Sequence, residues 1–351
     1  MPSALHVARD VPPATRHGVN PNQLRSRQVV PQVSVILPVY NGAPWLAESI
    51  QSVLAQTFEQ LELIVIDDGS VDDSWSVISA FKDPRVRAIR QTNRGLAATL
   101  NVGIKLSQTE FIARQDQDDL MDPERLARQF AFLKNNPRVV AVGTRARILA
   151  NDRLTSRELR HPLESRSINL FLLFDNPFVH SSMMLRRKAV ESLGGYCEDR
   201  SRQPPEDYEL WSRMSVDFEL VNLGDVLTTY REVQGSMSRA GANPFGEKLI
   251  EISAENLYRV LGRAYSEDKC RELSRLFHGV RSNSMIELRE AMRMIDLVAL
   301  RLGGAKSNWS QEYRGLYRAL KRRVFIRRAL MLIPVGTVTW LIHVKRRILQ
   351  K

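Results

Sequence analysis

The chain has 351 residues, of which 43% are hydrophobic, so it can bury a large core as one large domain with additions or as two domains. Its two cysteines, Cys197 and Cys270, exclude a disulfide framework and favour a reducing compartment, which makes the cytoplasm the expected location. The net charge of +12 does not indicate a nucleic-acid-binding surface, because residues 301 to 351 hold thirteen Lys or Arg against one acid, Glu312, and the rest is neutral.

Residues 1 to 31 are predicted to form a flexible leader. They contain Pro12, Pro13 and Pro31 and several arginines, and they lack the continuous apolar stretch of a signal peptide. From Val33 onward the pattern changes to apolar β-branched runs that alternate with helical patterns.

Five apolar runs predict strands, at residues 33 to 37, 61 to 66, 86 to 89, 111 to 119 and 139 to 142. Helical patterns with short loops lie between them, which predicts an α/β fold with a mostly parallel sheet covered on both faces. No Gly-x-Gly-x-x-Gly motif follows the first strand and no Gly-Lys-Ser/Thr loop is present. These absences argue against a dinucleotide oxidoreductase and a P-loop enzyme.

The fourth run ends in three acids, Asp116, Asp118 and Asp119. In an extended segment, Asp116 and Asp118 would point to one face and Asp119 to the other. Two carboxylates on one face repel each other unless a hard divalent cation lies between them. The alternative is a polar loop that follows a strand and binds nothing.

Polar residues follow each of the first four predicted strands. Ligands bind beyond the carboxyl ends of the strands in such sheets, so we expect these clusters to line one crevice. They are Tyr40-Asn41, Asp67-Asp68, Asn93-Arg94-Gly95 and residues 116 to 119.

At this point five motifs resemble a known family in both order and spacing. They are VSVILPVYN at 33 to 41, VIDDGS at 65 to 70, NRGL at 93 to 96, ARQDQDD at 113 to 119 and PEDYELW at 205 to 211. The chain resembles family 2 glycosyltransferases of the bacterial polysaccharide type over roughly residues 32 to 235. The resemblance implies a GT-A fold, with a Rossmann-like sheet flanked by helices, and an inverting sugar transfer from a nucleoside-diphosphate sugar.

The resemblance also divides the chain. It implies a catalytic domain at residues 32 to 240, with a nucleotide-sugar half at 32 to 145 and an acceptor half at 146 to 240. Helical patterns after residue 240 predict a helical extension at 241 to 320, and a basic and apolar tail follows at 321 to 351.

By the family pattern, Asp116 and Asp118 are an Asp-x-Asp pair that binds Mg²⁺ or Mn²⁺, and the cation holds the diphosphate leaving group. Asp118 is the expected direct ligand and Asp116 the residue nearer the ribose, while Asp119 is an alternative ligand. Asp67 and Asp68 resemble the acids that accept hydrogen bonds from the base and ribose. An Asx turn or a helix N-cap is their alternative role.

The remaining donor-side residues follow from the same resemblance. The backbone of Pro38 and the ring of Tyr40 would flank the base. Asn41, Asn93 and Gly95 would complete the donor rim. Arg114 would offset diphosphate charge, or else pair with a local acid.

An inverting transfer needs a base that takes the proton from the acceptor hydroxyl. The Glu-Asp motif assigns this role to Asp207, with Glu206 beside it, and the alternative is that Asp207 caps a helix from residue 208. His180 lies in a segment that similar enzymes place at the acceptor, although a lone His is often structural. Gly194 and Gly195 would form the floor under the acceptor.

Residues 329 to 344 form an apolar run of sixteen residues between basic flanks. It is short of the roughly twenty residues that span a bilayer, and Pro334 and Gly336 interrupt it. We therefore expect a monotopic or re-entrant anchor on an anionic membrane, with Trp340 at the interface. A C-terminal core helix is the alternative.

The sequence as a whole predicts a metal-dependent, inverting glycosyltransferase at the cytoplasmic membrane face. The donor would be a UDP-sugar or a similar nucleotide sugar, and the acceptor a glycan or lipid-linked glycan of a cell-surface polysaccharide. One rival is a nucleotidyltransferase, whose Gly-rich first loop is missing here. The other is a non-enzymatic module that binds nucleic acid or membrane, whose binding should survive Asp118→Ala and vanish without residues 321 to 351.

Overall fold

The computed structural model describes residues 30 to 233, 245 to 281 and 284 to 332. The chain divides into two units, residues 1 to 30 and 31 to 351, and the fold below is that of the second unit. The predicted leader therefore lies almost entirely outside the described residues. The strands are β1 (Val33–Val39), β2 (Leu61–Asp67), β3 (Val86–Arg90), β4 (Phe111–Arg114), β5 (Leu120–Met121), β6 (Val139–Ala150), β7 (Arg153–Leu159), β8 (Met184–Arg186) and β9 (Glu219–Glu232).

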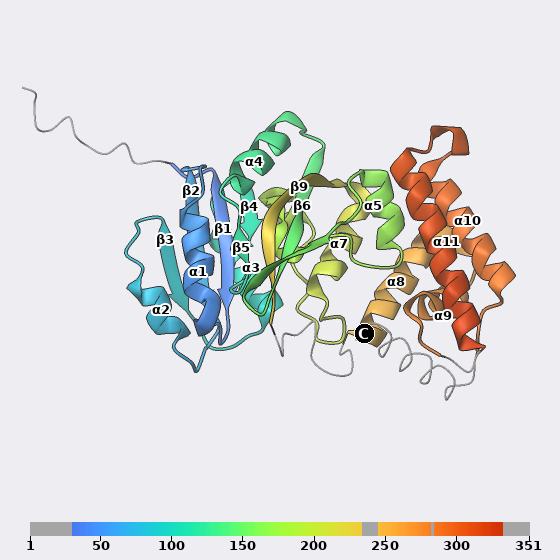
Figure 1. Cartoon of the computed structure of the whole chain (residues 1–351), viewed down its shortest axis with the longest axis horizontal. Helices are drawn as coiled ribbons and strands as arrows, with labels where there is room; N and C mark the ends of the chain where they lie inside the picture. The colour runs from blue at the N-terminus through green and yellow to red at the C-terminus, as the bar shows by residue number, and fades with distance from the viewer. Residues whose placement is uncertain (1–29, 234–244, 282–283, 333–351) are drawn as a thin grey trace, which may run out of the picture. The chain divides into compact units, whose positions relative to one another are not determined.

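Helices alternate with the first strands and then dominate the C-terminal part (Figure 1). The α-helices are α1 (Ala43–Leu54), α2 (Ser74–Ala80), α3 (Leu96–Leu106), α4 (Arg125–Asn135), α5 (Ser165–Leu172), α6 (Arg187–Ser192), α7 (Glu206–Asp217), α8 (Gly246–Leu261), α9 (Glu267–His278), α10 (Leu288–Gly303) and α11 (Gln311–Met331). The short 3-10 turn η2 (His180–Ser182) precedes β8.

The strands form one sheet in the order β3-β2-β1-β4-β8-β6-β9-β5, and β7 pairs with β6. Strands β3, β2, β1 and β4 are parallel, which confirms the predicted α/β arrangement. Beyond β4 the pairing changes: β8 is antiparallel to both β4 and β6, β9 is parallel to β6, and β5 is antiparallel to β9. The pairing of β5 with β9 brings the end of β9 against the acidic segment that precedes β5.

Alternation along β1 explains why helices cover both faces of the sheet. Val35 and Leu37 pack into a core cluster with α1 and α4, whereas Ile36 packs into another cluster with α3, α5 and α7. Both faces of β1 are apolar because each is buried, which is the pattern expected of a central parallel strand.

The helices α8 to α11, residues 246 to 331, form a helical extension with its own apolar core, which also includes Leu170 and Phe174 from the α5 region. The boundary predicted at residue 240 lies outside the described residues. The boundary predicted at 320 falls inside α11, because Leu320 and Val324 both face the core of the extension. No helix within the described residues is long and apolar enough to cross a membrane. Most of the apolar run at 329 to 344 lies outside them.

Candidate active site

The acidic segment is a turn that follows β4. Strand β4 ends at Arg114, and Gln117 and Asp118 form the turn. The extended conformation predicted for the acids is therefore wrong. The backbone of residues 115 to 119 is bent because contacts from distant parts of the chain hold it. One of these is a hydrogen bond from the Ser49 hydroxyl to the carbonyl of Asp116 (2.7 Å).

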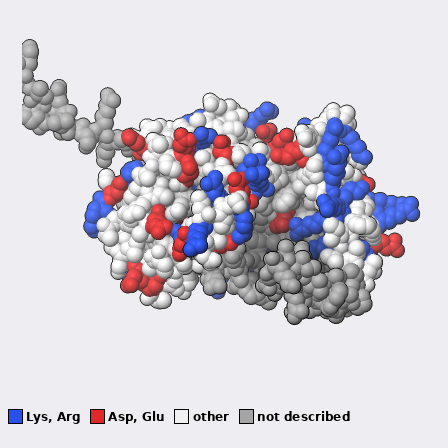
Figure 2. Space-filling model, in the orientation of Figure 1, with Lys and Arg blue, Asp and Glu red and all other residues white. Residues whose placement is uncertain are grey.

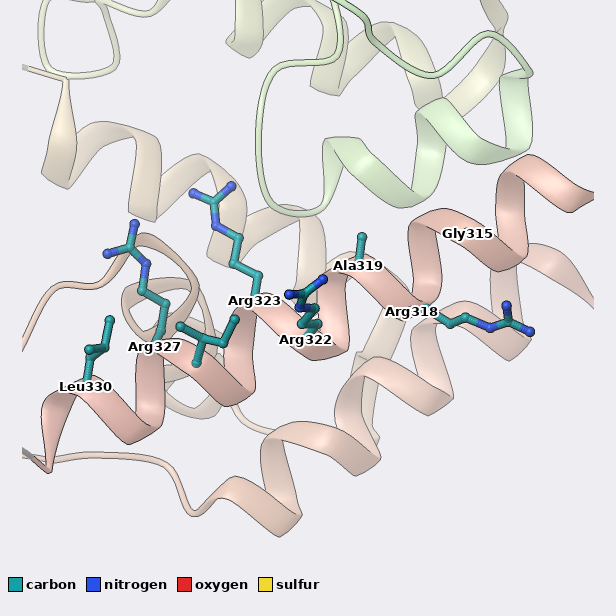
Figure 3. Close-up of a pocket in the computed structure, with 8 residues that line it drawn as sticks. Gly315, Arg318, Ala319, Arg322, Arg323, Arg327 and Leu330 are labelled. Atoms are coloured by element: carbon teal, nitrogen blue, oxygen red, sulfur yellow. The ribbon is translucent and has the colours of Figure 1, made fainter. Parts of the chain in front are cut away.

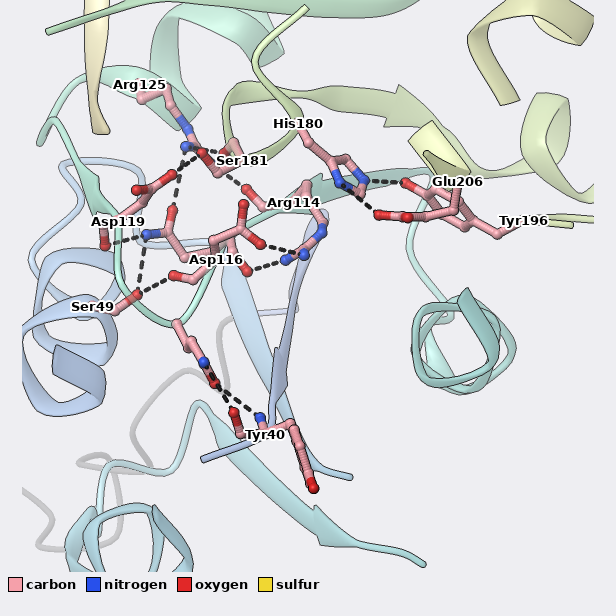
Figure 4. Close-up of polar contacts among 12 residues, drawn as sticks. Tyr40, Ser49, Arg114, Asp116, Asp119, Arg125, His180, Ser181, Tyr196 and Glu206 are labelled. Atoms are coloured by element: carbon pink, nitrogen blue, oxygen red, sulfur yellow. Dashed lines mark hydrogen bonds and ion pairs between the residues drawn. The ribbon is translucent and has the colours of Figure 1, made fainter. Parts of the chain in front are cut away.

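Gln117 fastens this turn to the loop after β1. Its Oε1 accepts from the backbone N–H of Tyr40 (2.9 Å), and its Nε2 donates to the carbonyl of Tyr40 (3.1 Å), as Figure 4 shows. A Cβ on Gly42 would lie 2.4 Å from Gln117 Oε1, so only glycine leaves room for this pairing. The carboxylates on either side of Gln117 are thus held next to the donor-side loop.

Asp119 fixes the turn to η2 and to β9. It is buried, and its two oxygens accept from the Ser181 hydroxyl and from the backbone N–H of Arg231 (2.9 Å). The guanidinium of Arg231 also donates to the carbonyl of Asp118 (3.0 Å). Both carboxylate oxygens of Asp119 are thus engaged within the protein, and its role as an alternative metal ligand stays a prediction.

Asp116 and Asp118 differ in their surroundings. Arg114 is buried and donates to the carbonyl of Gln115 and to the carboxylate of Asp116, so it pairs with a local acid. The Asp118 carboxylate accepts no hydrogen bond from another residue within the described part of the chain. Burial, followed by the nearby charge of Asp116, raises the pKa of Asp118 to about 6.

A divalent cation fits these residues in part. Carboxylate oxygens are the ligands that Mg²⁺ and Mn²⁺ prefer, and a cation would relieve the repulsion that raises the pKa of Asp118. Within the described residues no group of three or more His, Cys, Asp or Glu side chains could hold a metal. The two acids would therefore need further oxygen ligands from a substrate and water, as is usual for Mg²⁺ sites.

Asp67 and Asp68 both hold loops in place. Asp67 is fully buried; it accepts from the backbone N–H of Ser70 (2.9 Å) and forms an ion pair with Arg90 (3.0 Å). Asp68 accepts from Gln91 Nε2 (2.7 Å) and from the backbone N–H groups of Arg94 and Gly95 (2.9 Å each). The turn role considered for this pair is thus present, and base or ribose binding stays a prediction.

The other donor-side residues lie at the same end of the sheet. Tyr40 is 49% exposed, which leaves its ring available for stacking. Asn41 has a positive φ of 51° and bridges to the loop after β2, where its Oδ1 accepts from the N–H of Val71 (2.9 Å). Pro38 is within β1, and Asn93 is exposed beside Gly69. The binding roles of these residues stay predictions.

Helix α7 carries the acids of the Glu-Asp motif. It begins at Glu206, and Pro205 occupies the N-cap position, so the capping role considered for Asp207 is wrong. Asp207 lies in the first turn, where the helix dipole favours a carboxylate. Its Oδ2 accepts from Asn176 Nδ2 (2.6 Å).

Glu206 faces His180 rather than Asn176. Glu206 Oε1 lies 3.7 Å from His180 Nδ1, and His180 Nε2 lies 2.8 Å from the hydroxyl of Tyr196 (Figure 4). Burial and the positive charge of Arg114 hold the pKa of His180 well below its usual value, so the ring is neutral at pH 7. His180 and Tyr196 thus form a neutral polar pair next to the two acids.

The two motif acids lie near the acidic turn. Burial, followed by the charge of Asp207, raises the pKa of Glu206 to about 7, and burial also raises the pKa of Asp207. The charge of Asp116 contributes to both shifts, which places the β4 turn and the start of α7 within electrostatic reach of each other. Turn η2 also links the two groups, because Ser181 donates to Asp119 while His180 faces Glu206. The crevice itself stays a prediction.

The glycine pair at 194 and 195 forms a tight turn with positive φ values of 78° and 79°. A Cβ on Gly195 would lie 2.4 Å from Asn101 Oδ1. Asn101 in turn accepts from the N–H of Tyr196 (2.8 Å) and donates to its carbonyl (2.9 Å). The turn thus fixes the position of Tyr196 beside His180.

Several residues of this site were not singled out from the sequence. Gln117 could have been noticed because it lies between the two motif acids. The buried Arg125, whose pKa burial lowers to about 9, donates to the carbonyls of Ser181 (2.6 Å) and Arg114 (2.7 Å). Arg125 follows the acidic motif but belongs to no motif itself, and Arg231 is far from that motif in the sequence, so no local signal identifies either residue. Asn176 adjoins the His180 segment but carries no motif of its own.

Comparison with known proteins gives the family. The family model described as Glycosyl transferase family 2 matches residues 34–194. The putative glycosyltransferase EpsE of Bacillus subtilis is 36% identical over 214 residues, which are 60% of this chain and 76% of that protein. This chain is a family 2 glycosyltransferase. The O-antigen biosynthesis glycosyltransferase WbnJ of Escherichia coli is 30% identical over 214 residues, covering 59% of this glycosyltransferase and 82% of the relative.

Solved structures resemble this glycosyltransferase in fold. S. aureus TarS 1-349 in complex with UDP-GlcNAc matches with a TM-score of 0.55 and 20% identity, over 83% of this chain and 90% of that one. The mannosyltransferase PcManGT from Pyrobaculum calidifontis, in complex with GDP-Man and Mn²⁺, matches with a TM-score of 0.52 over 87% of each chain. The similarity confirms the GT-A arrangement of a sheet flanked by helices.

Proposed function

We propose that this glycosyltransferase moves a hexosyl or N-acetylhexosaminyl group from a nucleoside-diphosphate sugar to a glycan or lipid-linked acceptor, with inversion and with a divalent cation. The context is polysaccharide assembly at the cytoplasmic face of the membrane. Two named relatives support that context: WbnJ, and the amylovoran biosynthesis glycosyltransferase AmsE of Erwinia amylovora, which is 32% identical over 204 residues.

The observation that carries the proposal is the meeting of two carboxylate groups with different roles. Asp116 and Asp118 lie in the turn after β4, and Asp207 lies at the start of α7 within reach of the charge of Asp116. A sugar transfer needs both a site that neutralises a departing diphosphate and a base on the acceptor side. This arrangement supplies carboxylates for each need.

The residues of this chain divide the chemistry between them. Asp118 and Asp116 would hold the cation, which when bound neutralises charge on the diphosphate. Asp207 accepts the proton of the acceptor hydroxyl as that oxygen attacks the anomeric carbon. The raised pKa of Asp207 makes it a stronger base once ionised. Tyr40 stacks on the nucleotide base, and Gln117 keeps the cation ligands next to Tyr40.

The test is a panel of UDP- and GDP-sugars with Mn²⁺, scored by release of the free nucleoside diphosphate. Asp118→Ala and Asp207→Asn should each lower turnover at least a hundredfold, in the range that removal of a charged catalytic group costs. Both variants should unfold at the temperature of the unchanged chain. Asp225→Asn is the matched control, because Asp225 is a half-exposed acid of β9 that pairs with Arg128 of α4 (2.8 Å). Undiminished turnover in Asp118→Ala or Asp207→Asn would refute the assignment.

Helix α11 supports the membrane part of the proposal. Figure 2 shows Lys and Arg side chains gathered over the helical extension, and Figure 3 shows Arg318, Arg322 and Arg327 along α11. These arginines line a shallow pocket along α11. Ile326 and Leu330 line the same pocket and are 43% and 39% exposed. Arginines next to exposed apolar side chains suit the boundary between anionic headgroups and acyl chains. We propose that α11 lies against the membrane.

A further inference from the structure

We propose that Asn176 is a positioning residue for Asp207, and that the helical extension takes part in the reaction by holding Asn176 in place. This inference rests on the proposed role of Asp207 as the base. It gives residues 246 to 331 a task in the reaction, although they lie beyond the family match at residues 34–194.

The amide of Asn176 is held in one orientation. Its Oδ1 accepts from the backbone N–H of Phe178 (3.1 Å), so its Nδ2 points to Asp207 Oδ2 (2.6 Å). The backbone N–H of Asn176 donates to Asp175 Oδ1 (3.0 Å). Asn176 therefore presents a donor to the carboxylate. A carboxylate that accepts such a bond is held in one rotamer and is favoured in its ionised form.

Asn176 ends a segment, residues 172 to 176, whose first three carbonyl groups are each held by a side chain of the helical extension. Helix α8 supplies Ser253, which donates to the carbonyl of Leu173 (2.7 Å), and Asn256, which donates to that of Leu172 (2.9 Å). From α9, His278 Nε2 lies 2.8 Å from the carbonyl of Phe174. Three side chains of the extension thus hold three consecutive carbonyls of this segment.

The same segment is also bound from the catalytic side. The hydroxyl of Tyr208, which follows Asp207 in α7, donates to the carbonyl of Leu172 (2.7 Å). Directly after the segment, the carbonyl of Pro177 accepts from Asn222 of β9 (3.0 Å). Residues 172 to 176 therefore lie between the extension and the base-bearing helix, and the position of Asn176 depends on both.

An aromatic stack adds packing to these hydrogen bonds. The rings of Phe174 and Phe277 lie 4.8 Å apart, and the guanidinium of Arg323 lies 3.9 Å over Phe277. Arg323 belongs to α11, so the stack runs from the last described helix to the residue two positions before Asn176. Interactions of this kind rigidify the segment because each ring is buried against the next.

Other titratable groups also surround Asp207 and bear on any pH experiment. In the described part of the chain, the charge of Asp116 acts on Asp207, while Asp207 itself acts on Glu206 and on the neutral Tyr196, and Arg114 acts on those two residues. Burial and the charge of Asp116 raise the pKa of Asp207, whereas hydrogen bonds from the backbone N–H of Tyr208 (2.7 Å) and from the Asn176 amide lower it. Removing Asn176 takes away one of these lowering hydrogen bonds, so the pKa of Asp207 should rise.

The experiment compares Asn176→Ala and Asn176→Asp in the full chain. Carbon-13 NMR of labelled aspartate carboxyl groups, with Asp207 assigned through Asp207→Asn, measures the pKa of Asp207 without any substrate. We expect a higher pKa in Asn176→Ala and a still higher one in Asn176→Asp, where a second carboxylate faces the first. Asn136→Ala is the matched control, since Asn136 is also partly buried and bonded to a carbonyl, at the end of α4.

Turnover of UDP-GlcNAc or GDP-mannose, whichever the unchanged chain uses, gives the second measurement. Asn176→Ala should lower kcat about tenfold to a hundredfold, leave the KM for the donor unchanged and move the acid limb of kcat to higher pH. His278→Ala should shift both quantities in the same direction by less. An unchanged pKa and kcat in Asn176→Ala, with Asp207→Asn inactive, overturns this inference alone. Activity in Asp207→Asn would instead remove the proposed function.

Discussion

At the scale of single residues, Glu206 makes stability depend on pH. Burial and the neighbouring Asp207 raise its pKa to about 7, above the ordinary 4.5 of glutamate. Between these values the folded chain keeps a proton that the unfolded chain releases, so this residue lowers stability as pH rises from about 4.5 to 7. Glu206→Gln keeps the shape and removes the buried charge.

We therefore expect Glu206→Gln to be more stable than the unchanged chain at pH 8, by on the order of 1 to 3 kcal/mol, and equally stable near pH 4.5. Urea unfolding at the two pH values measures the difference. Glu219→Gln is the control, because Glu219 is half-exposed and 4.0 Å from Arg138. The same pH dependence in both variants would contradict an effect of burial at Glu206.

Asp207 and Asp119 show how far single residues could be predicted from the sequence. The motif around Asp207 pointed to the correct helix, but the sequence could not exclude a capping role, which required knowing that α7 begins at Glu206. Asp119 was an alternative metal ligand in the sequence because it directly follows Asp118. Its partners, Ser181 and Arg231, are 62 and 112 residues away in the sequence, and only the folded chain shows that its oxygens are occupied.

At the scale of elements, the turn after β4 should depend on Gln117. Gln117→Ala removes both hydrogen bonds to the backbone of Tyr40, so the acids and the proposed base-stacking ring are no longer held together. We expect the variant to bind UDP or GDP with Mn²⁺ about tenfold more weakly in calorimetric titrations, the effect of losing about two modest hydrogen bonds.

Gln117→Glu keeps one of the two hydrogen bonds and removes the other. Its carboxylate can still accept from the N–H of Tyr40 but repels the carbonyl and adds a third negative charge between Asp116 and Asp118. Binding of the nucleotide alone should then fall further than in Gln117→Ala. Gln32→Ala, which removes an exposed amide pair with Gln60 (2.8 Å), is the control. Equal nucleotide affinity in all three variants would show that the hydrogen bonds between Gln117 and Tyr40 do not affect donor binding.

Element predictions succeeded where burial decides the pattern. The apolar runs at β1 and β2 and the helical spacing of α1 follow from burial on the sheet faces, and each lies where it was expected. Strand β6 was predicted to end at residue 142 but continues to Ala150, because its second half pairs with β9. The two-residue strand β5 has no pattern of its own and exists only through that same β9.

At the scale of the whole molecule, the basic C-terminal end cannot be tested by deletion, because part of it packs into the core of the extension. Deleting residues 321 to 351 would remove Val324, which is fully buried in the core of the extension, as well as the basic residues. Loss of membrane binding in that truncation could therefore reflect unfolding. Arg323 is equally unsuitable for substitution, because it stacks on Phe277 and donates to the carbonyl of that residue (3.3 Å).

Point variants on the exposed face of α11 avoid both problems. Arg318 and Arg322 are exposed, and Ile326 and Leu330 continue the same face one and two turns further on. Arg318→Ser with Arg322→Ser should weaken sedimentation with vesicles of phosphatidylcholine and phosphatidylglycerol about thirtyfold, since each basic residue contributes about 1 kcal/mol near an anionic surface. Added salt should reduce the binding of the unchanged chain in the same way.

Ile326→Ser with Leu330→Ser separates insertion from charge. If α11 lies at the boundary of headgroups and acyl chains, this pair should weaken binding even at high salt, where the arginine contribution is screened. Pure phosphatidylcholine vesicles and the exposed pair Arg87→Ser with Lys105→Ser serve as controls. A change of oligomeric state in sedimentation velocity, with vesicle binding intact, would instead show that a second copy of the chain covers this face. Because the extension also holds Asn176, membrane binding through α11 would secure the same helices that position the catalytic base.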